Sequence, residues 1–440
     1  MSEYWLFAIA ALYVAYGLFS KRLGTTIVTG PMIFVTVGFV LSSAGLGVID
    51  AESGDHIITI LLEATLAIVL FSDAAVINST NWRKEAFIPI RLLVIGLPTM
   101  IIIGLAVAAV MFTELSIWEA GLIAAILAPT DAALGQAVIS NPRVPRRIRQ
   151  GLATESGLND GIALVAVVVF LSAAQEALAG GSAGALLHFL ASEILLAAVV
   201  GIGLGWLGGK AIVYSTQRDW VSPIWLQIGA LAIGIGAYGL AVPLGGSGFI
   251  AAWLAGLLVG WTTRGKVDEV NVFSESVGSG MTMLSLMIFG AVFLVPALDF
   301  VTWETVVYAV LSLLVIRMVS VAISMIGSSV SVVSIGFMGW FGPRGLASIV
   351  LAGVVVESSA LPAEVQEVIV TVAMITVGLS VFAHGVTAFK GSEAYGRWIE
   401  RTRPELVEDV AEVDIRDEVP SRFQDPGVRQ AFVDDQASGD

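Results

Sequence analysis

Long apolar runs dominate this chain and restrict what it can fold into. About thirteen runs follow one another, and each is long enough to cross a lipid bilayer as a helix, which takes roughly 20 residues. They are continuous and rich in Leu, Ile, Val and Ala, whereas the strands of a membrane β-barrel would be short and alternating. The predicted runs are 3–20, 26–48, 57–78, 87–112, 116–138, 149–174, 184–207, 222–242, 246–262, 276–297, 302–326, 333–357 and 364–388.

Composition supports the same fold class, an all-α polytopic membrane protein. Only 13% of the residues are charged, against about 25% in a soluble domain. The chain has no cysteine, and its three histidines are far apart in the sequence. We therefore expect no disulfide framework, no resident metal and no cofactor. We also expect no nucleic-acid partner.

The positions of Lys and Arg test the helix count. Positive residues collect in cytoplasmic loops. With an outside N-terminus and a cytoplasmic C-terminus, all 22 Lys and Arg lie on the inner side, except Arg317 and Arg344 inside predicted helices. Glu3 occupies the place of a basic signal-peptide region, so the first run is predicted to be a retained helix. We predict a transmembrane domain over 1–390 and an acidic cytoplasmic tail over 391–440.

The sixth run holds the densest intramembrane polar cluster, Glu155-Ser156-Gly157-Leu158-Asn159-Asp160. On a helix, Ser156 and Asp160 share one face, and Glu155 and Asn159 form a neighbouring stripe. Asp160 lies about ten residues beyond the cytoplasmic entry, which is about 15 Å at the rise of a helix and near the centre of a roughly 30 Å core. A short Asp cannot snorkel from that depth, so Asp160 is predicted to be functional.

Two other runs are interrupted by proline. The fifth contains Pro129-Thr130-Asp131, and the twelfth contains Phe341-Gly342-Pro343-Arg344-Gly345. An offset of seven helices inverts the orientation, so residues of helices one to six and eight to thirteen are predicted to form inverted six-helix repeats. Paired broken helices of this kind indicate a transport site near the midplane. Asp131 is predicted either to bind a cation or to accept hydrogen bonds from the exposed helix N–H groups.

The buried arginines need anionic partners. Glu155 is the predicted partner of Arg344, while the partner of Arg317 stays open. Asp73, near the end of the third run, lies either on a polar path toward the site or at the cytoplasmic boundary.

The segments around Asp131, Asp160 and Arg344 together resemble the signature segments of sodium/proton antiporters, in the electroneutral branch of the monovalent cation:proton antiporter superfamily. The resemblance covers residues 1–390. It implies that Asp160 binds the cation in competition with protons, and that Asp131, Ser156 and the backbone around Thr130 complete the ligand shell. It also implies a Glu155–Arg344 pair and a homodimer. Ala132 stands where many relatives have proline, which puts the geometry of the first break in question.

The expected function is therefore exchange of a monovalent cation for a proton by alternating access, not an enzymatic reaction. Asn159 replaces the second aspartate of the electrogenic branch and is neutral, which favours one-for-one exchange. Na⁺ is the expected cation and Li⁺ a second candidate. The alternatives are a K⁺/H⁺ antiporter, a cation channel and an intramembrane hydrolase that uses Asp131 and Asp160. We expect the protein in the plasma (inner) membrane, with a role in pH homeostasis.

Overall fold

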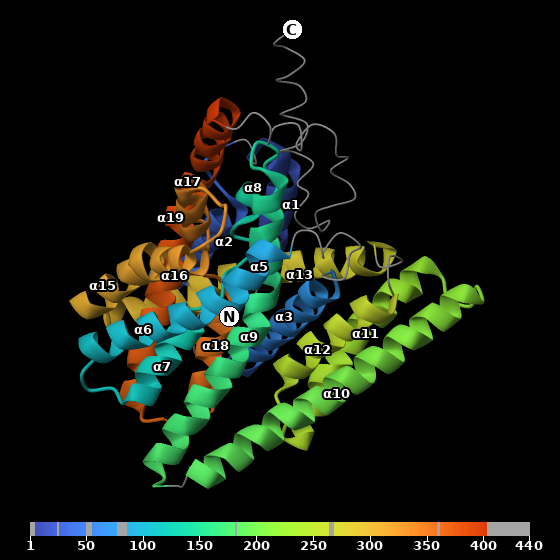
Figure 1. The fold of residues 1–440 in the computed structure, drawn as a ribbon, viewed down its shortest axis with the longest axis horizontal. Helices are drawn as coiled ribbons and strands as arrows, with labels where there is room; N and C mark the ends of the chain where they lie inside the picture. Colours follow the sequence, from blue (N-terminus) through green and yellow to red (C-terminus); the bar gives the residue numbers. More distant parts are fainter. Residues whose placement is uncertain are drawn as a thin grey trace.

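The computed structural model describes residues 5–23, 26–49, 55–76, 86–180, 183–263, 268–358 and 361–402, and all regular secondary structure in these residues is helical (Figure 1). Within them, nine helices are long and apolar enough to cross a membrane, and four shorter apolar helices have 10–17 residues. The predicted all-α membrane fold is confirmed. The number of thirteen crossings stays a prediction.

The helices follow the predicted runs, with the main differences at their ends. In the first half of the chain they are α1 (Trp5–Leu23), α2 (Gly30–Leu41), α3 (Asp55–Val76), α5 (Phe87–Arg91), η2 (Leu92–Gly96), α6 (Leu97–Met111), α7 (Ile117–Ile126), α8 (Gln136–Ile139), α9 (Arg146–Leu178) and α10 (Ala183–Gln217). In the second half they are α11 (Pro223–Ala241), η3 (Val242–Leu244), α12 (Gly248–Thr263), α13 (Asp268–Ile288), η4 (Phe289–Phe293), α14 (Leu294–Asp299), α15 (Trp303–Leu311), η5 (Ser312–Ile316), α16 (Arg317–Ser324), α17 (Val332–Trp340), α18 (Leu346–Glu357) and α19 (Ala363–Thr402).

Several helices continue past the apolar runs that predicted them. The helix α9 begins at Arg146, and α19 continues to Thr402 across the predicted domain boundary at residue 390. Hydropathy marks only the part of a helix that lies in lipid, so polar turns at its ends are missed. The remaining tail, 403–440, and the predicted inner-loop residues Arg83, Lys84, Arg264 and Lys266 lie outside the described residues.

Helices seven positions apart show matching irregularities. The continuous helical segments α5–η2–α6 and α15–η5–α16 each contain five residues of π-helix. The rods α7–α8 and α17–α18 are both interrupted, the second between Trp340 and Leu346. This pairing supports the predicted inverted repeat and its two broken helices, because independent helices would have no reason to deviate at equivalent places.

The helix α9 runs between two groups of helices (Figure 1). One group holds α6, α7 and α15 to α19, and the other holds α3 and α10 to α13. In the second group glycines allow close backbone approach: an added Cβ at Gly201 or Gly205 of α10 would lie 2.5 Å from a carbonyl oxygen of α12. The polar turn of α9 therefore lies where the two groups meet.

Candidate functional site

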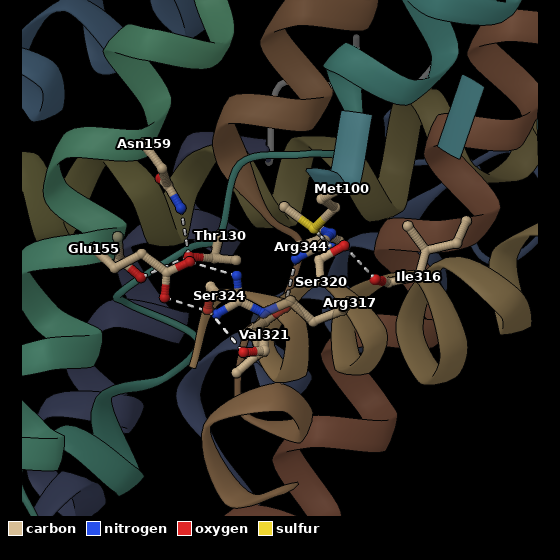
Figure 2. Close-up of polar contacts among 12 residues, drawn as sticks. Met100, Thr130, Glu155, Asn159, Ile316, Arg317, Ser320, Val321, Ser324 and Arg344 are labelled. Carbon is tan, nitrogen blue, oxygen red and sulfur yellow. Dashed lines mark hydrogen bonds and ion pairs between the residues drawn. The ribbon is translucent and has the colours of Figure 1, made fainter. Parts of the chain in front are cut away.

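Three side chains of α9 and the first break form a buried hydrogen-bonded chain. The amide of Asn159 donates to the Thr130 hydroxyl at 2.7 Å (Figure 2). The hydroxyl oxygens of Thr130 and Ser156 lie 2.9 Å apart. Thr130 is 2% exposed, Ser156 7% and Asn159 0%. The structure thus brings together three of the predicted site residues, one from the first break and two from α9.

The carboxylate of Asp160 lies one turn further along α9 from Ser156, and its residue is 8% exposed. Asp73 of α3 packs against the same helix, because an added Cβ at Gly157 would lie 3.3 Å from the Asp73 Cβ. Gly157 and Asp160 are three residues apart and share a face of α9. On the next turn, Gly161 lies directly against the indole of Trp253 from α12. Asp73 therefore lies beside the polar turn of α9, and it is buried.

The carboxylate of Asp131 holds backbone N–H groups of both broken helices. One oxygen accepts from Ala133 N at 2.7 Å and Leu134 N at 3.3 Å, and the other accepts from Leu346 N at 2.8 Å. The Asp131 N–H in turn donates to the Pro343 carbonyl oxygen at 2.8 Å. Of the two predicted roles, acceptor for exposed helix N–H groups is the one observed. Binding of a cation by Asp131 stays a prediction.

Further contacts join the two broken helices where they cross. The hydroxyl of Ser348 in α18 donates to the carbonyl oxygen of Ile126, the last residue of α7, at 2.8 Å. Gly345 lies so close to the Asp131 carboxylate that an added Cβ would overlap it. Each broken helix therefore satisfies terminal backbone groups of the other, which would otherwise be unpaired in a membrane.

The predicted Glu155–Arg344 pair is wrong: Glu155 pairs with Arg317. Both guanidinium Nη atoms of Arg317 donate to the Glu155 carboxylate, Nη2 to Oε2 at 2.7 Å, and the side chains are 3% and 2% exposed (Figure 2). Arg317 is the first residue of α16 and directly follows the π segment η5. Both arginines were possible partners by depth, and only the path of α16 selects between them.

Arg344 is fully buried and is held differently. Its Nη1 donates to the Gly342 carbonyl oxygen at 2.7 Å, and its Nη2 lies 3.1 Å from the sulfur of Met100 (Figure 2). Among the ion pairs of the described residues, none includes Arg344. The second break therefore carries a positive charge held by a backbone carbonyl and a thioether rather than by a carboxylate.

Sequence reasoning missed Ser348 and Met100. No sequence signal singled out Ser348, because a serine in an apolar run does not show which carbonyl of another helix its hydroxyl meets. Met100 carries no such signal, since a methionine in an apolar run is expected of any packed membrane helix. Within the described residues, no group of three or more His, Asp or Glu side chains is arranged to hold a metal ion.

A profile of the family described as "Sodium/hydrogen exchanger, transmembrane" matches residues 7–389, most of the chain. The chain belongs to the sodium/hydrogen exchanger family. It is thus a multi-pass membrane protein of a family of transporters rather than of enzymes. The fold is similar to that of the sodium proton antiporter MjNhaP1 from Methanocaldococcus jannaschii, with a TM-score of 0.68 and 20% identity over 86% of this chain and 97% of that one.

Two curated antiporters are also similar to this chain in sequence. The K⁺/H⁺ antiporter NhaP2 of Shewanella sp. (strain MR-4) is 28% identical over 352 residues, covering 78% of this chain and 58% of that protein. The Na⁺/H⁺ antiporter ApNhaP of Aphanothece halophytica is 30% identical over 225 residues, covering 51% of this chain and 42% of that protein. The chain spans less than two thirds of the length of these curated relatives.

Proposed function

We propose that this chain exchanges one monovalent cation for one proton at Asp160. The observation that carries the proposal is a buried carboxylate one turn from the Thr130–Ser156 hydroxyl pair, at the boundary between two groups of helices. A buried ionised carboxylate is unfavourable unless a positive charge accompanies it. A proton and an alkali-metal ion both satisfy that requirement, so the two compete for the same group.

The ligand shell follows from the oxygen atoms near Asp160. An alkali-metal ion that enters a protein exchanges its hydration shell for oxygen ligands. Asp160, Ser156 and Thr130 supply carboxylate and hydroxyl oxygens, and we include Asp131 through the unused capacity of the oxygen that also accepts from Leu346 N. Asp73 packs on the same turn of α9, so we assign it to the path by which the ion reaches Asp160.

The stoichiometry is set by the number of titrating groups. Asp160 loaded with a proton and Asp160 loaded with a cation have the same net charge. Asn159 holds Thr130 by an amide hydrogen bond and carries no proton of its own for exchange. One cation then replaces one proton, and the cycle is electroneutral.

Alternating access requires the site to open to one side at a time. Asp160 lies on α9, between the group of α6, α7 and α15 to α19 and the group of α3 and α10 to α13. Movement of one group against the other, with the broken helices kept as one unit by Asp131 and Ser348, would switch the exposure of the site.

The proposal assigns a monovalent alkali-metal ion as the transported cation. Na⁺ is our first assignment and Li⁺ the second. K⁺ is the main alternative, because matched relatives carry K⁺/H⁺ as well as Na⁺/H⁺ antiporter names. A channel or an intramembrane hydrolase is disfavoured, since neither explains two broken helices that satisfy each other's termini.

The cellular setting completes the proposal. We place the protein in the plasma (inner) membrane, with the N-terminus outside and the C-terminus in the cytoplasm, as a homodimer that contributes to pH homeostasis. The transmembrane domain is taken as 1–390 and the acidic tail as 391–440, with α19 crossing that boundary. The Lys and Arg positions support the orientation.

Flux measurements in vesicles test the proposal. The purified chain is reconstituted with an internal pH indicator, and Na⁺, Li⁺ or K⁺ is added against a preset pH gradient. We expect saturable dissipation of the gradient, with a rate that an imposed membrane potential does not change. Asp160→Asn should reduce the rate to that of protein-free vesicles, because the amide cannot exchange a proton for a cation.

The matched control is Asp299→Asn, which makes the same change at the exposed end of α14 and should leave the flux unchanged. Retained cation-driven proton flux in Asp160→Asn would refute the assignment of the site. A strong dependence of the flux on voltage would refute one-for-one exchange while leaving antiport itself intact.

A further inference from the structure

The imidazole of His384 is buried in the second half of α19 and faces the second break. Its residue is 2% exposed. Nε2 lies 2.8 Å from the carbonyl oxygen of Trp340, the last residue of α17. A carbonyl oxygen can only accept and a neutral imidazole has one N–H group, so the tautomer with its hydrogen on Nε2 is the one that donates to Trp340. The His384 ring also stacks on the Trp340 indole, with centroids 4.9 Å apart at 25°.

The other ring nitrogen connects His384 to the far end of the same break. Nδ1 lies 3.2 Å from the Ser380 hydroxyl, and that hydroxyl accepts the backbone N–H of Arg344 at 2.7 Å. Nδ1 also lies 2.9 Å from the Ser380 carbonyl oxygen, and in the Nε2–H tautomer these two acceptors form no hydrogen bond with each other. With the hydrogen on Nε2, one chain runs from Arg344 N–H through Ser380 O–H to Nδ1, and from Nε2–H to the Trp340 carbonyl. Both ends of the break are therefore held by one turn of α19.

Further contacts on the same face of α19 extend this attachment. The Trp340 indole N–H donates to the Thr387 hydroxyl at 2.9 Å, and Gly391 lies against the ring of Phe341, 2.7 Å from an added Cβ. Residues spaced by three and four positions share one face of a helix. The helix α19 thus presents a continuous surface to the end of α17 and to the break.

The break that His384 holds is also the one that Asp131 contacts. Pro343 accepts the Asp131 N–H, and Leu346 N donates to its carboxylate. Asp131 follows Thr130 directly, and Thr130 belongs to the hydroxyl chain with Ser156. Displacement of the break would therefore move Thr130 relative to Asp160.

We propose that His384 is a positioning residue for the cation site, acting through Trp340 and Ser380 on the break at 341–345. This inference rests on the proposed cation exchange at Asp160. It assigns to His384 no contact with the ion. Its effect is on the geometry of the ligand shell, and so on how much cation is needed to fill the site.

Two substitutions at His384 separate positioning from packing, in the full-length chain reconstituted in vesicles. His384→Phe keeps a flat ring against Trp340 and removes both nitrogen atoms. His384→Gln keeps an N–H group able to reach the Trp340 carbonyl. We expect His384→Phe to raise the half-saturating Na⁺ concentration about 3- to 10-fold, as the loss of one or two buried hydrogen bonds predicts. His384→Gln should lie closer to the parent chain than to His384→Phe.

Ser380→Ala provides a second variant, because it breaks the link to Arg344 N with little change in volume. We expect it to raise the half-saturating Na⁺ concentration as much as His384→Phe does. Thr376→Val is its control: Thr376 is buried one turn away on α19, and its hydroxyl bonds to Val372 O of its own helix at 2.7 Å. Thr376→Val should have the same half-saturating Na⁺ concentration as the parent chain. If His384→Phe does not insert, Ser380→Ala decides, and a parent-like value there would overturn the inference.

Binding is measured separately from flux, as the Na⁺-dependent rise in thermal unfolding temperature of the purified protein. A parent chain that is stabilised by Na⁺ but exchanges nothing would refute the proposed function, and His384 would then be judged on binding with the same expected shift. If His384→Phe needs the same Na⁺ concentration as the parent chain for half-saturation and for stabilisation, the inference is overturned. A His384→Gln chain no better than His384→Phe would overturn it too, since packing alone would then explain the effect. Absence of stabilisation of the parent by Na⁺, Li⁺ and K⁺ would also overturn it.

Discussion

The two broken helices occupy equivalent places in the chain but carry opposite charge at the break. The first break presents Thr130 to α9 and carries the Asp131 carboxylate, and the second carries the buried Arg344. Each also satisfies backbone groups of the other, through the Asp131 carboxylate and the Ser348 hydroxyl. The comparison teaches that the two halves of an inverted repeat can share one backbone geometry while their side chains have different roles. In the proposed function the first half supplies cation ligands, and the second supplies attachment and a compensating charge.

The largest expected effect tests which arginine is tied to α9. Arg317→Met leaves the Glu155 carboxylate buried without its partner, which should cost about 3–5 kcal/mol of unfolding free energy. Arg344→Met should cost less, because no carboxylate pairs with Arg344 among the described residues. Thermal unfolding in detergent micelles measures both.

The control for this prediction is the double substitution Glu155→Gln with Arg317→Met, which removes both charges and should recover most of the loss. If Glu155→Gln instead rescued Arg344→Met, the second break would be the one paired to α9. The conclusion that Arg317 and not Arg344 pairs with Glu155 would then be wrong.

The contact shared by both breaks should be the next most sensitive. Gly345→Ala forces a methyl group into the Asp131 carboxylate, and we expect a loss of about 3 kcal/mol from overpacking and a broken hydrogen bond. Gly353→Ala is the matched control, because an added Cβ there meets nothing within 4 Å. Equal melting temperatures for the two variants would show that the breaks do not depend on this contact.

The substitution Asp131→Asn tests whether Asp131 binds the cation in addition to accepting backbone N–H groups. The amide cannot accept as many backbone N–H groups as the carboxylate, so stability should fall by about 2 kcal/mol. We further expect Na⁺ to lose its stabilising effect on the variant. Calorimetric titration with Na⁺ measures this loss directly. Unchanged Na⁺ affinity in a destabilised variant would restrict Asp131 to the structural role.

The smallest expected effect concerns Ser348. Ser348→Ala removes the donor to the Ile126 carbonyl at the end of α7 and should cost about 1 kcal/mol. Exchange should continue, because the hydroxyl is not among the proposed ligands. Comparison with Ser358→Ala, whose hydroxyl bonds to Val355 O within the C-terminal turn of its own helix at 2.8 Å, controls for loss of a hydroxyl. A complete loss of flux in Ser348→Ala would make the second half a direct part of the cation site.

Much of this could be predicted from the amino-acid sequence, because each inference depended on local physical rules. Continuous apolar runs require helices in lipid, since the backbone must satisfy its own hydrogen bonds there. Charged residues in such runs are costly, which singled out Asp160, Glu155, Arg317 and Arg344. The spacing of Ser156 and Asp160 placed them on one helical face, and proline marked both breaks.

Only the tertiary structure decided which distant groups meet. Arg317 and Arg344 lie at similar depth by sequence, and the path of α16 after its π segment brings Arg317 to Glu155. Packing of α3 on Gly157 sets Asp73 beside the polar turn of α9, a neighbour that the sequence did not indicate. His384 belonged to no motif, and its place at the second break depends on the direction of one face of α19. Periodicity fixes a side chain's face on its own helix, whereas pairing between helices depends on how whole helices cross.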